Sequence, residues 1–245
     1  MSTDQDDHRF RDWFLDQSSD EWQQLHNLNS PTPLYTASMI PNILGIGYVS
    51  PNIMYQYMTG KKIYDMEAIS KAPPITWGKL HEKDALAEFV QKYPHCIVTR
   101  PGLVRHKDHD YVAASLDGLL LRCDDSDDSS MVNLEIKCPY SKHIPFNRDE
   151  VHDNWLLQTQ IQMACAGESV RQSYLWIWTP DKNVMWIIPR QQKLIDFAIK
   201  EVREFDCIVK GFAPPPEQPS RKKNWQCNGG ETIKLFMKEL KTLIL

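Results

Sequence analysis

The chain has 245 residues, 42% hydrophobic content and a formal net charge of -4, which suits one sizeable α/β domain. This slightly acidic balance excludes a protein that coats nucleic acid through a uniformly basic surface, although it permits a local basic groove. No apolar run approaches the roughly 20 residues of a membrane helix, the chain starts unlike a signal peptide, and six scattered cysteines form no Cys-x-x-Cys pair. We therefore expect a soluble, intracellular protein with reduced thiols, neither secreted nor membrane-bound.

The first 70 residues are expected to form a helical part. Residues 8–28 carry aromatic side chains among charges in a loosely helical pattern, and the prolines at 31 and 33 then interrupt it. A short helix follows from Ala37 to Leu44. The clearest helix runs from Pro74 to Tyr93, with Glu82 set off from most of an apolar stripe that consists of Trp77, Leu80, Leu86, Phe89, Val90 and Tyr93.

The next segments have a strand-like pattern, from Cys96 to Thr99, from Tyr111 to Cys123 and from Met131 to Cys138. An acidic, serine-rich run at 124–130 has the composition of a turn between the last two. If these strands pair antiparallel about residue 126 or 127, Asp117 falls opposite Glu135 or Lys137 on the same face of the sheet.

The remainder predicts a helix from Asp149 to Gly167, strands from Tyr174 to Thr179 and from Val184 to Ile188, and a helix from Gln191 to Gly211. Residues 212–245 then combine a proline-rich linker, a basic cluster at 221–223 and an amphipathic helix from Glu231. We interpret residues 1–245 as a single domain, with a core at 71–211.

The strand at 131–138 carries the most informative chemistry. Glu135 and Lys137 are two residues apart, so both project from one face of a strand while Ile136 points into the opposite layer. Asp117, Glu135 and the backbone carbonyl of Ile136 offer hard oxygen ligands for Mg²⁺, for which Mn²⁺ would substitute, in one or two ions. Such a centre suits phosphodiester hydrolysis.

The other candidate residues receive supporting roles. Lys137 would orient or deprotonate the attacking water, with a pKa lowered by nearby metal and by burial. Glu82 would complete the metal shell, and Ser115 would donate a hydrogen bond to a phosphate oxygen.

Several of these signals have plainer interpretations. A lone Glu-x-Lys is usually a solvated face, and it is the company of Asp117, Glu82 and a glutamine-rich helix that favours a site. Gln158 and Gln160 are candidate DNA contacts or simply the polar side of a helix, and Gln158 shares a face with Gln162, not with Gln160.

Ser38 is a phosphate contact or a helix cap. For His106 and His109, an exposed loop or a contact to the DNA backbone is favoured over metal binding.

The motifs together resemble the phage lambda exonuclease and YqaJ-like viral recombinase family of the PD-(D/E)XK nuclease superfamily. The segments that carry this resemblance, across about residues 22–205, are Tyr35-Thr-Ala-Ser38, Trp77-Gly-Lys79 with Glu82, Ala114-Ser-Leu-Asp-Gly118, Leu134-Glu-Ile-Lys-Cys-Pro139 and Gln158-Thr-Gln160.

The resemblance implies a restriction-endonuclease-like core, with a mixed central β-sheet flanked by helices. It also implies Mg²⁺-dependent, 5′-to-3′ degradation of one strand of duplex DNA in viral or phage-type recombination, in the cytoplasm or nucleus of the host if the protein is viral. A homo-oligomer and a single-strand annealing protein would be the partners.

Two departures from the family pattern keep alternatives open. Leu116 stands where a proline is usual, and the stretch Asn27–Pro33 lacks the arginine that usually grips a 5′ phosphate. An endonuclease or an RNA-degrading nuclease on the same fold is therefore the second hypothesis. A noncatalytic nucleic-acid-binding protein is the third, and the retention of Asp117, Glu135 and Lys137 argues against it.

Overall fold

The structure is a computed structural model that describes residues 12–13, 15, 19–25, 27–28, 30, 32–121, 131–215 and 230–245. The acidic turn predicted at 124–130 and the basic cluster at 221–223 lie outside the described residues.

A five-stranded mixed sheet forms the centre of the molecule, with strand order β2-β5-β6-β7-β8. Its β6 and β7 strands are parallel, and the other neighbours are antiparallel. The strands are β2 (Ile97–Thr99), β5 (Gly118–Leu121), β6 (Val132–Lys137), β7 (Gln172–Thr179) and β8 (Lys182–Pro189). The prediction of a mixed sheet flanked by helices is confirmed.

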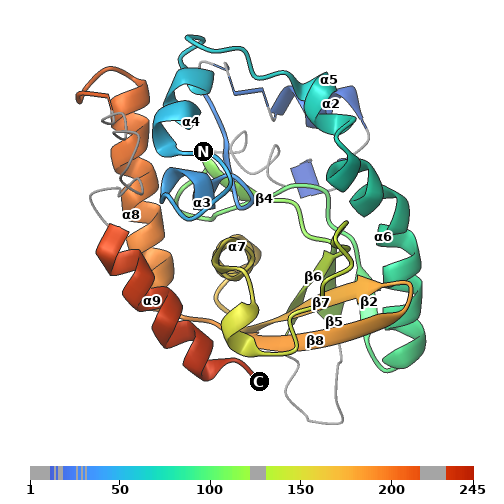
Figure 1. The fold of residues 1–245 in the computed structure, drawn as a ribbon. Coiled ribbons are helices and arrows are strands. Elements are labelled where there is room, and N and C mark those ends of the chain that lie inside the picture. Colours follow the sequence, from blue (N-terminus) through green and yellow to red (C-terminus); the bar gives the residue numbers. More distant parts are fainter. Residues whose placement is uncertain are drawn as a thin grey trace, which may run out of the picture.

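Two helices cover opposite faces of this sheet (Figure 1). They are α6 (Pro73–Lys92) and α7 (Asp153–Ala166). Because side chains alternate along β6, Leu134 and Ile136 pack with Phe89 of α6, whereas Asn133 and Glu135 face the glutamines of α7. This alternation places the polar side of β6 beneath α7.

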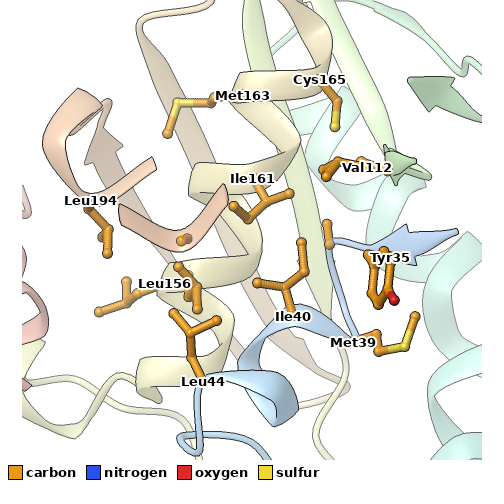
Figure 2. Close-up of a cluster of buried hydrophobic side chains, with 14 of the residues drawn as sticks. Tyr35, Met39, Ile40, Leu44, Val112, Leu156, Ile161, Met163, Cys165 and Leu194 are labelled. Carbon is orange, nitrogen blue, oxygen red and sulfur yellow. The ribbon is translucent and has the colours of Figure 1, made fainter. Parts of the chain in front are cut away.

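A second, smaller sheet joins the N-terminal part to the core. It has the order β1-β4-β3, with β1 (Tyr35–Thr36) parallel to β4 (Val112–Ala114) and β3 (Val104–Arg105) antiparallel to β4. Tyr35 is fully buried beside the short helix α3 (Ile40–Ile43), and Figure 2 shows it in one cluster with Ile40 and with Leu156 and Ile161 of α7. The main core therefore lies between this sheet and α7.

The remaining helices surround these layers. They are α2 (Asp20–Leu25), α4 (Pro51–Met58), α5 (Met66–Ser70), the 3₁₀ turn η1 (Arg148–Glu150), α8 (Gln192–Val209) and α9 (Gly230–Leu243). The end of the chain packs on the sheet, because Leu245 and Ile187 of β8 exchange both backbone hydrogen bonds. Among the described residues, no helix is long and apolar enough to cross a membrane.

Some predicted elements were wrong in extent. The strand expected from Tyr111 to Cys123 is two strands in different sheets, β4 and β5, separated at 115–117. The expected stripe on α6 includes Leu80 and Val90, which are 67% and 42% exposed, because the sheet covers only a narrow face around Ala85 and Phe89. The predicted helix from Asp149 begins as a separate 3₁₀ turn, and α7 starts at Asp153.

Candidate active site

Glu135 and Lys137 lie side by side on the α7 face of β6, as their spacing predicts. Glu135 is buried, with only 3% of its side chain exposed, and its Oε1 lies 2.5 Å from Nζ of Lys137. Burying a carboxylate is costly unless it is paired and hydrogen-bonded. The ion pair with Lys137 supplies the first part of that compensation.

Asp117 reaches the same place from the break between β4 and β5. The β5–β6 register pairs Gly118 with Leu134, so this antiparallel pair is centred on residue 126, as predicted, and Asp117 stands opposite Glu135. The Oδ2 atom of Asp117 accepts a hydrogen bond of 2.7 Å from the N–H of Ile136. A Cβ at Gly118 would approach Val98 Cγ1 to 2.9 Å, so the strand closes tightly directly after Asp117.

Two glutamines of α7 hold the carboxylate of Glu135 from above. Gln158 donates to Glu135 Oε1 at 2.8 Å and accepts from Lys137 Nζ at 3.0 Å. Gln162 donates to Glu135 Oε2 and to the carbonyl of Ser115, and it accepts from Asn133 at 3.0 Å. Because residues four apart share a helix face, one face of α7 fixes the site.

Gln160, a candidate DNA contact in the sequence, does not lie at this site, and that prediction is corrected. Gln160 is fully buried; its amide donates to the carbonyl of Pro189 and its oxygen accepts from the N–H of Gln191, both at 2.8 Å. It lies two residues from Gln158, about 200° around the helix. Gln160 therefore joins the end of β8 to α8, and it is not available to DNA.

Glu82 approaches the cluster from α6, on the other face of the sheet. Its Oε1 accepts from Arg100 Nη2 at 2.6 Å, and its side chain is 35% exposed. Its negative charge also raises the pKa of Asp117, so the two carboxylates are close enough to interact. Glu82 is therefore near Asp117 and is held by an arginine that the sequence did not single out.

The electrostatics of the site reflect close carboxylates. Burial raises the pKa of Asp117 well above its usual value, and the charges of Glu135 and Glu82 raise it further. Burial alone would lower the pKa of Lys137, but the adjacent Glu135 and Asp117 outweigh burial and raise it. Among these side chains alone the ammonium ion of Lys137 is stabilised, and the lowering of its pKa beside a bound metal stays a prediction.

The donor set fits a hard divalent cation. Asp117, Glu135 and Glu82 provide carboxylate oxygens, and their mutual repulsion is what a cation would relieve. The N–H of Ile136 points to Asp117, and in a strand the C=O of a residue points the same way as its N–H, so its carbonyl faces this edge too. No three His, Cys, Asp or Glu side chains of the described ranges are already gathered as a metal site.

The two candidate serines lie at the ends of parallel neighbouring strands. The β1–β4 register pairs Thr36 with Ala113, so Ser38 and Ser115 follow the two strands at equivalent positions. Ser115 Oγ accepts from Trp22 Nε1 at 3.3 Å, and the exposed Ser38 lies 3.3 Å from Thr36 Oγ1.

The sequence placed Gln162 on one face with Gln158 but gave it no separate role, and other residues of the site were missed. Asn133 carried a usable signal, because it lies two residues from Glu135. Arg100 carried none, because its contact with Glu82 depends on how α6 meets β2.

The mixed sheet with its buried carboxylate and lysine beneath a glutamine-bearing helix is of the nuclease type. The chain belongs to the family of the YqaJ-like viral recombinase domain, whose model matches residues 21–169. This confirms the resemblance seen in the sequence. No curated protein matches the chain.

Solved structures similar to this chain include exonucleases. The alkaline exonuclease LHK-Exo of Laribacter hongkongensis is 20% identical, with a TM-score of 0.55, over 92% of this chain and 100% of that one. Its complex with dAMP gives a TM-score of 0.59 at the same identity and coverage. A phage-related exonuclease of Haemophilus somnus 129PT is 13% identical, with a TM-score of 0.54, over 74% of this chain and 96% of that one. At these identities the likeness shows the fold.

Proposed function

We propose that this protein is a Mg²⁺-dependent nuclease that hydrolyses phosphodiester bonds of duplex DNA. The observation that carries the proposal is the convergence of Asp117, Glu135 and Lys137 under Gln158. Membership of the YqaJ-like family and the fold shared with exonucleases support it.

The residues would divide the work as follows. Asp117, Glu135, Glu82 and the carbonyl of Ile136 would hold Mg²⁺, or Mn²⁺ in its place, which supplies Lewis acidity at the scissile phosphate when bound. Lys137, cationic beside Glu135, places a positive charge where charge on the phosphate develops, and its N–H groups orient the attacking water. Gln158 fixes the side chains of Glu135 and Lys137 relative to each other, because it forms a hydrogen bond with each.

We further propose that cleavage is exonucleolytic, runs 5′ to 3′, and serves viral or phage-type recombination beside a single-strand annealing protein. A homo-oligomer belongs to the same proposal. Ser38 and Ser115, at the ends of β1 and β4, would contact a phosphate of the strand.

A second candidate is an endonuclease or RNA-degrading nuclease on the same fold. The observation that favours it is the absence of any arginine between Asn27 and Pro33, because a strict exonuclease needs a group that recognises the strand end. A noncatalytic DNA-binding protein is the remaining alternative.

The test is cleavage by the purified full-length chain of linear duplex, covalently closed circular duplex, 5′-dephosphorylated duplex and RNA, with Mg²⁺, with Mn²⁺ and with EDTA. We expect Mg²⁺-dependent release of nucleotides from linear duplex and none from closed circles. Digestion of closed circles or of RNA would select the second candidate.

Matched variants assign the activity to this site. Lys137→Ala and Asp117→Asn should each reduce the rate by about 10²-fold or more, while Lys238→Ala, which removes an exposed charge on α9, should not. Cleavage that survives both site variants unchanged would show that this chain is not the nuclease.

A further inference from the structure

A second cavity, of about 800 Å³, lies away from the carboxylates. It opens between the end of α7, the first two-thirds of α8 and the loop after β3, and its lining does not include Asp117, Glu135 or Lys137. Only Ala164 and Ile199 contribute apolar side chains to the lining. Its size matches ligand sites, but its polarity suits a hydrated, charged ligand.

The cavity is positive although the chain carries a net charge of -4. Five basic side chains line it against three acidic ones, before the histidines are considered. The basic residues are Lys107, Arg171, Arg190, Lys200 and Arg203, and the acidic residues are Asp108, Glu168 and Asp196. A concave surface of one sign concentrates ions of the other.

Arg190 is a fixed charge at one wall. Its Nη1 donates to the carbonyls of Met163, Gly167 and Val170, at 2.8, 3.0 and 3.3 Å, where α7 ends. These carbonyls orient the guanidinium without neutralising its charge. No carboxylate of the described residues forms an ion pair with it.

Three of the other four cations are accessible to a ligand, and the fourth, Lys200, lies 3.7 Å from Glu204. Within the described part of the chain, Arg171 and Arg203 form no ion pair, and both are exposed. Lys107 pairs with Glu168 at 2.6 Å, but both side chains are more than half exposed, and such pairs contribute little in water. A phosphate can therefore compete for all three.

His106 and His109 add an aromatic surface to the same cavity. Their rings lie 4.9 Å apart at 37°. Burial lowers the pKa of His106, and the positive charges of His109, Arg190 and Lys107 lower it further. Aromatic rings beside arginines are the combination that recognises a base and its phosphate.

We propose that this cavity is a second binding site for phosphate groups, carried by a nucleic-acid strand or by a free nucleotide, with the bases against His106 and His109. Arginine suits this task because its planar donors match phosphate oxygens. The inference rests on the proposed function, which supplies both ligands as substrate and product. It also explains the His106–His109 segment, which the active site does not use.

The test measures binding to full-length protein in EDTA, in a Lys137→Ala background that prevents cleavage. The probes are a short fluorescein-labelled single strand, followed by anisotropy, and thymidine 5′-monophosphate and inorganic phosphate, followed by calorimetry. Arg203→Gln and Arg171→Gln should each weaken binding by roughly tenfold. Each should also lower the salt dependence of strand binding by about 0.7 in log–log slope.

Controls separate the cavity from general charge. Lys238→Gln, on α9, removes one exposed charge outside the cavity and should leave affinity unchanged, and Arg203→Lys should keep most of it. Loss of nucleotide binding identifies a nucleotide site, and loss of strand binding alone identifies a strand site. Affinity for all three probes that is the same in wild type and in both glutamine variants overturns the inference.

Two further measurements keep the result interpretable. If a glutamine variant fails to fold, a crystal of the wild-type protein soaked with thymidine 5′-monophosphate decides: density in the cavity supports the site, and density confined to the Asp117 centre overturns it. Cleavage is measured in a separate experiment, with protein that retains Lys137. Absence of cavity binding in the protein with both arginines intact, together with intact cleavage, refutes only this inference. Absent cleavage with cavity binding intact refutes only the proposed nuclease.

Discussion

Glu135 illustrates how a single charged residue is kept in the interior. Its carboxylate is satisfied by one ammonium group and two amides, from Lys137, Gln158 and Gln162. Each of these partners has a second contact, so the network as a whole is fixed. A buried polar network of this kind is stable only while its members are satisfied.

Replacing Gln162 by methionine should lower both stability and activity. The change leaves Glu135 Oε2 and the carbonyl of Ser115 without their donor, which costs about 1–3 kcal/mol of unfolding free energy. The cleavage rate should fall by about 10-fold or more, because the carboxylate loses its orientation. Urea unfolding and single-turnover cleavage measure the two effects.

Gln160→Met is the matched control, because Gln160 is equally buried on the same helix but faces β8 and α8. It should lose similar stability and keep kcat within about twofold. A large loss of kcat in this variant would show that fixing the helix, and not the carboxylate, limits the rate.

Glu82 should matter less than Asp117 and Glu135. It is partly exposed and already paired with Arg100, so we expect Glu82→Gln to raise the Mg²⁺ concentration for half-maximal rate by about 10- to 100-fold. At saturating Mg²⁺ much of the rate should return. Asp117→Asn should show no such recovery, and identical behaviour of the two variants would contradict the ranking.

Much of this site follows from local rules. A period of two puts Glu135 and Lys137 on one face, and the antiparallel register of β5 and β6 puts Asp117 opposite Glu135. The direction of Gln160 and the arrival of Arg100 do not follow, because they depend on the packing of helices against strands that are distant in sequence. The sequence therefore predicted the site residues that lie on one pair of neighbouring strands, and not those whose positions depend on helix packing.

Helix α7 ends at a residue that only glycine fits well. Gly167 has φ +117° and ψ 172°, a region that side chains make strained. Gly167→Ala should therefore destabilise the protein by about 1–3 kcal/mol although no atom lies within 4 Å of the added Cβ. The melting midpoint, read by circular dichroism, reports the loss.

Gly78→Ala should have the opposite effect on stability, because it should stabilise the protein. Gly78 lies inside α6, and its added Cβ also meets no atom within 4 Å. Alanine there stabilises a helix by about 0.5–1 kcal/mol. Equal shifts in the two alanine variants would mean that backbone conformation does not set the difference.

Element boundaries were the least predictable feature of the fold. The run from Tyr111 to Cys123 is continuously strand-like in composition, yet the chain leaves one sheet at Ala114 and enters another at Gly118. Strands of two residues, such as β1 and β3, give no periodic signal. They form because parallel and antiparallel partners on β4 are available, which is a tertiary effect.

At the scale of the whole molecule, α9 closes the fold. Its Ile233, Met237 and Leu240 are buried, and Leu245 completes a backbone pair with β8. The sequence predicted the amphipathic helix but gave no information on whether it docks, since its partners on α7 and β8 lie about 40 residues or more earlier in the chain.

Leu240→Ala should destabilise the protein by about 2–5 kcal/mol, because it empties a fully buried position. Leu235→Ala changes the same residue type on the same helix at a position that is 68% exposed, and its effect should stay within about 0.5 kcal/mol. The denaturant midpoints of the two variants, compared with that of the wild type, measure both effects. Equal, small effects would show that α9 is not part of the cooperative unit.

The parallel pairing of β6 with β7 spans α7, so the acid on the strand and the amides on the helix belong to one crossover connection. A nascent chain that leaves the ribosome with only the β5–β6 hairpin has Asp117 and Glu135 in place but neither amide. The reactive centre is therefore assembled late in synthesis, when residues up to about 180 have emerged and β7 has joined the sheet.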